Sequence, residues 1–221
     1  MWPIKLLGVF GVVLAVSLVL ASGAAAKPGE QFVIEEPSGP VAVTIGDAVR
    51  LQAVEPVVFD AGSWSIKCEQ GMLAGTIAEV AAREIALSLP TLDFSGFPPS
   101  PCESTWGATK VMFPPSPIMG VVKKNGKAEL TGTEGRGLVF TLDFTEKGIS
   151  CTYRASKVKS IFPPNPIEPI VLKSGEAKLK LASEGSSTEC PKTGALMSDA
   201  WALTARTLSS ELFYPAALEQ L

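Results

Sequence analysis

The chain has 221 residues, a net charge of −3 and no histidine. The lack of histidine excludes Ser-His-Asp and Cys-His nucleophile systems in their usual form, and also histidine-ligated zinc, copper, haem and non-haem iron sites. The mildly acidic balance argues against nucleic-acid binding, which requires a basic face.

Residues 1–26 have the three parts of a cleavable secretory signal peptide. Lys5 supplies the positive start, residues 6–20 form an uncharged apolar core, and the alanines at 24–26 form a small-residue exit. An uncleaved anchor is the alternative, because residues 6–26 are long enough to cross a bilayer. The small residues at the end of this stretch favour cleavage. We therefore expect a chain that is secreted or held in the cell envelope, with no stable membrane anchor after cleavage.

Residues 27–60 are expected to contain a loose N-terminus followed by lead-in strands. Short apolar runs at 32–34 and 41–45 flank the turn residues at 37–40, and residues 47–53 continue the pattern. Toward the middle of the chain, residues 77–87 are rich in good helix formers, and propensity alone predicts a helix there. Glu84 interrupts the apolar face of that helix, and the matching segment of a later copy is a tight turn. We therefore predict two strands joined by a longer loop.

An internal duplication with an offset of 49 residues dominates the second half of the chain. Residues 113–130 and 162–179 are identical at 10 of 18 positions, and Cys102 and Cys151 have the same offset. Each copy begins with Phe-Pro-Pro-x-Pro, which lacks ladder donors and is expected to be an extended connector or edge. Each copy then predicts a hairpin, one of them turning at Asn125-Gly126 in type I′ geometry.

The strand pattern continues to the C-terminus, at 149–155, 177–182 and 201–207. Many short strands separated by Gly and Pro turns predict an all-β fold, a β-sandwich built from the duplication over residues 61–214. The sequence leaves open whether the two copies form one sandwich or two modules, and we favour one sandwich. Residues 215–221 are expected to be a tail with a frayed turn of helix.

Four cysteines, an even number in an exported chain, predict two disulfides. Three pairings are possible. We favour Cys68–Cys102 with Cys151–Cys190, because each closes a loop of 34 or 39 residues within one half. A four-thiolate zinc site is the alternative, but such sites bring cysteines together in close pairs. No two of these cysteines are closer than 34 positions.

Several fragments suggest catalysis or binding without completing a site. Ser156 with Lys159, and Lys192-Thr193-Gly194, match two serine β-lactamase elements, but the third element is missing. The recurring Asp93 and Asp143 suggest paired carboxylates, although strand-end acids also serve turns. The Phe-Pro-Pro-x-Pro segments suggest docking, although rigid spacers are the simpler interpretation. Four aromatic residues are candidates for ligand stacking or, more simply, for core packing: Trp64, Trp106, Tyr153 and Trp201.

The chain also resembles uncharacterised secreted β-proteins of soil actinobacteria. The resemblance covers about residues 61–214 and rests on Cys68-Glu69 before Leu73-x-Gly-Thr, the later Cys102, Cys151-Thr152-Tyr153 and the Trp201 strand. It implies a disulfide-bonded β fold and no particular activity.

No nucleotide-binding, phosphate-loop or calcium-loop pattern is present, so we expect no cofactor and no metal site. The leading hypothesis is a non-enzymatic exported β-protein that binds an unknown extracellular or cell-surface ligand or has a structural role. The alternative is a secreted carbohydrate-binding or carboxylate-dependent hydrolytic module.

Overall fold

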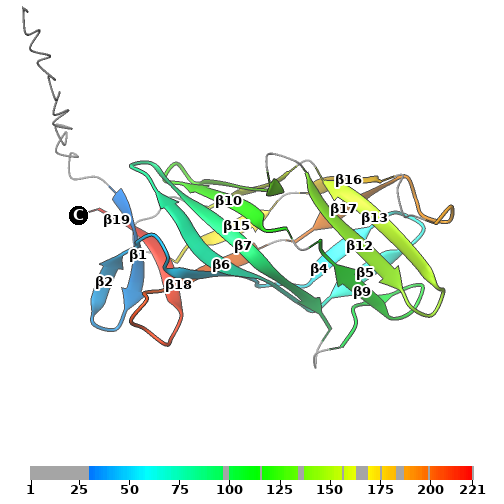
Figure 1. Cartoon of the computed structure of the whole chain (residues 1–221), viewed down its shortest axis with the longest axis horizontal. Coiled ribbons are helices and arrows are strands. Elements are labelled where there is room, and N and C mark those ends of the chain that lie inside the picture. Colours follow the sequence, from blue (N-terminus) through cyan, green and yellow to red (C-terminus); the bar gives the residue numbers. More distant parts are fainter. Residues whose placement is uncertain are drawn as a thin grey trace, which may run out of the picture.

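The structure is a computed structural model that describes residues 30–220 except 97–99, 115, 134–136, 156, 163–168, 175, 183–186 and 199. The leader expected at 1–26 lies outside the described residues. The regular elements of the described part are the strands β1 to β19, sixteen of which form two barrels lying end to end along the molecule (Figure 1).

The first barrel is closed. Its eight antiparallel strands are β3 (Ala48–Ala53), β6 (Gln70–Val80), β7 (Glu84–Ser95), β10 (Ile118–Lys123), β11 (Lys127–Thr131), β14 (Val158–Ile161), β15 (Val171–Ser174) and β18 (Ala200–Arg206). The pairing of β15 with β18 joins the two ends of this sheet. Three further strands extend from β18 at the outer end: β19 (Tyr214–Gln220), β1 (Glu30–Glu36) and β2 (Gly39–Ala42).

The second barrel is nearly closed. Its eight strands are β8 (Glu103–Ser104), β5 (Ser65–Cys68), β4 (Val57–Asp60), β17 (Thr193–Met197), β16 (Ala177–Leu181), β13 (Ile149–Ala155), β12 (Leu138–Phe144) and β9 (Thr109–Met112). The edge strands β8 and β9 approach each other at a single bridge between Cys102 and Thr109. The N–H groups of these two residues donate to each other's carbonyls at 2.8 and 2.9 Å.

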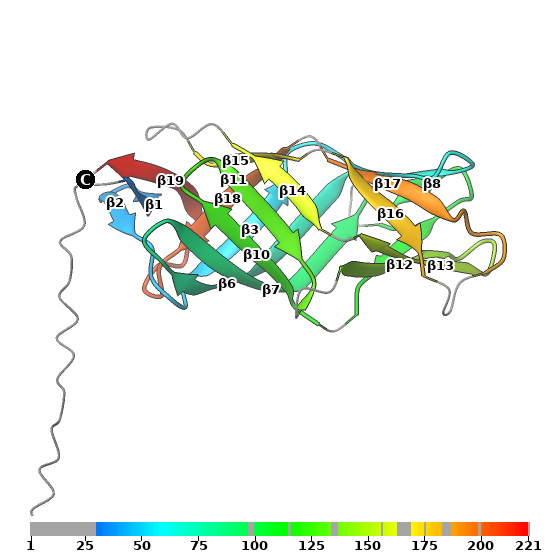
Figure 2. The ribbon, with the colours of Figure 1, turned by 90° about the horizontal axis from the view of Figure 1, so that it is seen from above.

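The chain passes repeatedly between the two barrels. After β3 it makes two strands in the second barrel and two in the first, and it continues in this way until β18. The described strands therefore imply eight crossings, and neither barrel is built from one continuous segment. Figure 2 shows the same alternation from above.

Strand alternation explains how both barrels are filled. In β12, β13 and β18 every second residue is buried, as a strand with one inward face requires. The inward side chains of both barrels form one continuous core. Aromatic rings cross the junction: Phe59 lies 5.2 Å from Phe140 and 6.1 Å from Phe94, which in turn lies 6.1 Å from Trp201, between ring centroids.

The all-β prediction is confirmed, whereas two closed or nearly closed barrels replace the expected sandwich. Period-two alternation shows which face of a strand is buried, but it does not show whether the outer strands of a sheet meet. Strands are also correct for residues 77–87, where β6 and β7 form a hairpin with a short loop at 81–83. In place of the helical turn expected at 215–221, β19 pairs with β1 and β18.

The two copies of the duplication predicted from the sequence occupy different places in the fold. In the first copy, β10 and β11 form the predicted hairpin. Its loop has three residues rather than two, because Lys123 pairs with Lys127. Gly126 adopts a positive φ of 79° and its N–H donates to the Lys123 carbonyl, as expected for a type I turn followed by a left-handed residue.

The second predicted hairpin is wrong. In that copy β15 pairs with β14 and β18 in the first barrel, while β16 pairs with β13 and β17 in the second. The chain therefore passes from one barrel to the other between Ser174 and Ala177. The sequence between two strands is compatible with either outcome, and the long-range strand partners decide between them.

Candidate functional site

The disulfide pairing predicted from the sequence is confirmed. Cys68 is bonded to Cys102 and Cys151 to Cys190, and all four residues are buried in or beside the second barrel. Each bridge closes a segment that leaves the second barrel, contributes two strands to the first and returns. Together they indicate an oxidising, extracellular-type environment.

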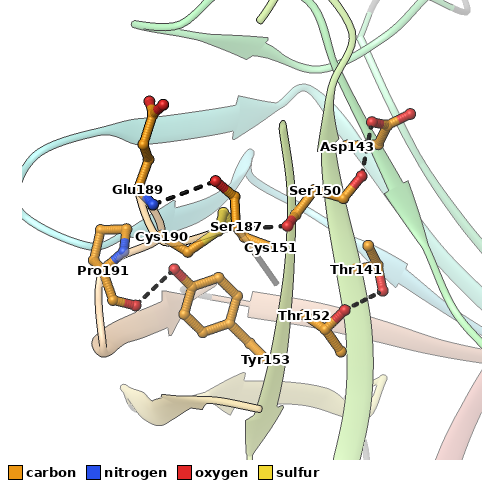
Figure 3. The surroundings of a disulfide bond; sticks show 10 residues. All are labelled: Thr141, Asp143, Ser150, Cys151, Thr152, Tyr153, Ser187, Glu189, Cys190 and Pro191. Atoms are coloured by element: carbon orange, nitrogen blue, oxygen red, sulfur yellow. Dashed lines mark hydrogen bonds between the residues drawn. A yellow bond between two sulfur atoms is a disulfide. The ribbon is translucent and has the colours of Figure 1, made fainter. Parts of the chain in front are cut away.

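The surroundings of Cys151–Cys190 are held by structural hydrogen bonds (Figure 3). The Tyr153 hydroxyl donates to the Pro191 carbonyl at 3.0 Å, and the hydroxyls of Thr141 and Thr152 are 2.9 Å apart across β12 and β13. The Ser150 hydroxyl donates to the Asp143 carboxylate at 3.1 Å. These contacts fix the strands and the returning loop.

The aromatic stacking candidates do not share an exposed surface. Trp64 is 2% exposed and Tyr153 fully buried inside the second barrel, with ring centroids 5.9 Å apart. Trp201 is 7% exposed and lies at the junction beside Phe94. Only Trp106 among the four is half-buried, and it packs 5.0 Å from Phe144. The side chains are therefore placed for core packing.

Burial raises the pKa of Tyr153 to about 12. The unfolded chain ionises this phenol near its ordinary value of about 10, so the native state loses relative stability as the pH rises from about 10 to 12. We expect urea unfolding midpoints to fall over this range and the fall to be smaller in Tyr153→Phe. The variant also loses the Pro191 hydrogen bond, which lowers its midpoint at neutral pH, so the slope with pH is the readout. Equal slopes for both proteins would contradict the assignment.

The other catalytic fragments remain dispersed. Asp93 lies in β7 of the first barrel, whereas Asp143 lies in β12 of the second. Lys192 is exposed beside the second disulfide, and Ser156 lies outside the described residues. No three His, Cys, Asp or Glu side chains of the described residues are grouped to hold a metal ion.

A small apolar cavity of about 40 Å³ lies at the junction of the barrels. Its walls include Phe94, Phe140 and Trp201, which come from both barrels. Ser198 also lines it, and its hydroxyl is buried without a hydrogen-bond partner among the described residues. The volume suits a few water molecules rather than an organic substrate.

A strongly basic surface lies on the outside of the molecule. We define the lysine face as the exposed side chains of Lys123, Lys127, Arg154, Lys159, Lys173, Lys178 and Lys180. In the first barrel, β10, β11, β14 and β15 place four exposed residues opposite one another in one row: Lys123, Lys127, Ile161 and Lys173. At a strand spacing of about 4.8 Å, this row covers about 14 Å measured around the curved wall of the barrel. Lys159 lies two residues along β14 from Ile161 on the same face.

The lysine face continues on the second barrel. There Arg154 of β13 is directly opposite Lys180 of β16, and Lys178 lies two residues earlier on the same face of β16. The chain connects the two halves directly, because β13 leads into β14 and β15 into β16. Figure 2 shows β11, β14 and β16 in turn along the molecule.

Few acidic groups offset this charge. Lys123 lies 3.6 Å from the Glu84 carboxylate, and Lys157 holds Glu129 at 2.9 Å. Within the part of the chain that the structure describes, Lys127, Lys159 and Lys173 form no ion pair. A hollow of about 290 Å³ opens between Lys123, Lys127 and Lys159. Of the three lysines around this hollow, Lys127 and Lys159 have no ion pair among the described residues, whereas Lys123 is paired with Glu84.

Sequence reasoning missed the lysine face because it considered the net charge of the whole chain. Between residues 120 and 182 there are eleven Lys and Arg against six Asp and Glu, whereas the rest of the chain after residue 26 has seven against sixteen. A charge count by segment contains this signal. The strand order is needed to show that the basic residues lie on neighbouring strands.

Comparison of the chain with models of known families, with curated proteins and with solved structures finds no significant match. The resemblance to secreted actinobacterial β-proteins stays a prediction. Among the described residues there is no helix with the length and hydropathy that a membrane span requires.

Proposed function

We propose that the protein is an exported, non-enzymatic binding protein that acts through its outer surface in the extracellular space or the cell envelope. In this proposal residues 1–26 direct export and are removed. Formation of both disulfides requires the oxidising conditions that export supplies. The resemblance to secreted β-proteins agrees with this location.

The observation that carries the proposal is the contrast between the interior and the surface. The interior of both barrels is filled by apolar and aromatic side chains, and the junction cavity is too small for an organic substrate. On the surface, strand pairing places exposed lysines on neighbouring strands of each barrel. A rigid, stapled scaffold that presents such a face suits binding better than catalysis.

The alternative of a carbohydrate-binding or hydrolytic module has less support. Sugar binding by stacking needs exposed aromatic faces, and Trp64, Tyr153 and Trp201 are buried. Carboxylate-dependent hydrolysis needs two carboxyl groups across one cleft, about 5–10 Å apart. The recurring Asp93 and Asp143 instead belong to different barrels.

The test expresses the full chain with its leader in a host that has an oxidising export compartment. The intact mass of the exported product reports cleavage, with Lys27 as the expected first residue. The product is then assayed against ester, peptide and glycoside substrates and mixed with isolated cell envelopes. We expect no turnover and retention on the envelope after washing. Substrate hydrolysis, or no retention, would refute the proposal.

A further inference from the structure

We propose that the lysine face binds a linear anionic polysaccharide of the cell envelope. This inference rests on the proposed binding function and names the chemical class of its partner. Lys127, Lys159 and Lys173 lie on the adjacent strands β11, β14 and β15 without an ion pair among the described residues, which makes charge complementarity the basis of the argument.

The arrangement of the basic groups lowers the stability of the fold when no ligand is bound. Arg154 is directly opposite Lys180 across β13 and β16. Lys123 is directly opposite Lys127 across β10 and β11, and Glu84, which is opposite Lys123 on β7, offsets only part of that repulsion. Like charges in directly opposed positions destabilise an antiparallel pair. A bound polyanion would convert both repulsive pairs into favourable contacts.

The hollow provides a place where anionic groups can approach several ammonium groups together. Lys123, Lys127 and Lys159 surround it, while its inner wall includes Ala128 and Ser160. Glu129, its acidic residue, is already neutralised by Lys157 at 2.9 Å. An incoming carboxylate or phosphate therefore meets a net positive environment.

The extent of the lysine face favours a polymer over a small anion. A single small anion contacts one or two exposed, hydrated lysines, and each such contact contributes little. A linear polymer can follow the face from β11, β14 and β15 to β16 and engage many charges at once. Each contact also releases condensed counterions, which makes the binding strong at low salt and steeply salt-dependent.

A membrane surface is a poorer fit for the same residues. Interfacial binding combines basic side chains with apolar groups that enter the headgroup region. On the lysine face the exposed large apolar side chain is Ile161, at 63%. The other strongly exposed apolar residues of the described chain belong to elements that do not contribute to the face, among them Ile45, Val54, Leu208 and Leu212.

The experiment measures binding of labelled polygalacturonate, a linear polymer of carboxylate-bearing sugars, to the exported protein between 50 and 200 mM NaCl. Neutral dextran and vesicles containing phosphatidylglycerol are the comparison ligands. The test variant is Lys127→Gln/Lys159→Gln/Lys173→Gln. The matched control is Lys110→Gln/Lys147→Gln/Lys192→Gln, which removes the same charge from exposed positions of the second barrel outside the face. Urea midpoints verify that both variants are folded.

We expect the wild type to bind polygalacturonate and not dextran, and the face variant to bind at least tenfold more weakly at 50 mM NaCl. The slope of log K against log salt should become shallower by about 2, since each contact contributes about 0.7. The control should bind within about twofold of the wild type. An equal loss in both variants, no polymer binding by the wild type, or binding to anionic vesicles in place of the polymer would overturn the inference.

Envelope retention of the same variants separates this inference from the proposed function. If the wild type and the face variant are both retained on envelopes, the protein binds there by another surface, so the inference fails and the proposed function stands. If the wild type is not retained, the proposed function itself fails. Loss of retention in the face variant alone supports both.

Discussion

Replacing Cys151 and Cys190 together by alanine is expected to lower the free energy of unfolding by about 4 kcal/mol. The bridge joins residues separated by 39 positions, so in the chain-entropy account its removal frees a long loop in the unfolded state. Domains are typically stable by only about 5–15 kcal/mol. The variant should therefore be marginally stable, which equilibrium unfolding in urea will measure.

The first bridge is the natural comparison for this experiment. Cys68–Cys102 spans 34 positions, and the entropy estimate for the two loops differs by only about 0.1 kcal/mol. Cys68→Ala/Cys102→Ala should therefore shift the urea midpoint by nearly the same amount. A loss below about 1 kcal/mol for either pair would show that the bridges do not restrict the unfolded chain as described.

Trp64→Ala is expected to cost about 3–5 kcal/mol, the range for removing a large aromatic side chain from a core. The Trp64 ring contacts Trp106, Phe144 and Tyr153 within the second barrel, with centroid distances of 5.3–6.3 Å. Its truncation would leave a cavity that the surrounding strands, held by two disulfides, cannot readily fill. Urea unfolding of the oxidised protein measures the loss.

Trp64→Phe tests whether ring packing is the cause of that loss. The indole N–H of Trp64 is buried without a hydrogen-bond partner among the described residues. Phenylalanine removes this unsatisfied donor while keeping an aromatic ring, so the two effects oppose each other and the net change should be within about 1 kcal/mol. A Phe variant as unstable as the Ala variant would contradict packing as the main contribution.

The sequence was sufficient for local structure and for the disulfides. Alternation located β13 at Ile149–Ala155 and indicated strands over residues 77–87 against their helix propensity. Cysteine spacing indicated the correct pairing, although each loop extends over both barrels rather than one half of the fold. These features depend on neighbouring residues or on chain connectivity.

Features that depend on distant strand partners were not predictable in this way. Closure of the first barrel depends on the pairing of β15 with β18. The first residue of β18, Ala200, lies 26 positions after Ser174, the last residue of β15. The same long-range pairing separates β15 from β16 and so removes the second hairpin. The lysine face has the same origin, because Lys127 and Lys173 come together only when β14 lies between their strands.

The crossing chain has a direct consequence for stability and for the proposed binding surface. Each barrel contains strands from several segments, both disulfides close loops that visit the other barrel, and the aromatic core crosses the junction. Unfolding of one barrel would therefore leave long flexible loops between the strands of the other and expose the shared core, so we expect the two barrels to unfold together. The lysine face extends over both barrels, so its charges keep a fixed arrangement only while both barrels are folded.

Hydrogen exchange measured by mass spectrometry across a urea series tests most directly whether the two barrels unfold together. Peptides from β6 and β10 report on the first barrel, and peptides from β13 and β16 report on the second. The interlocked fold predicts that all four lose protection at the same urea concentration, in one cooperative transition. Separate midpoints for the two pairs of peptides would show two independently folding barrels and would contradict the account.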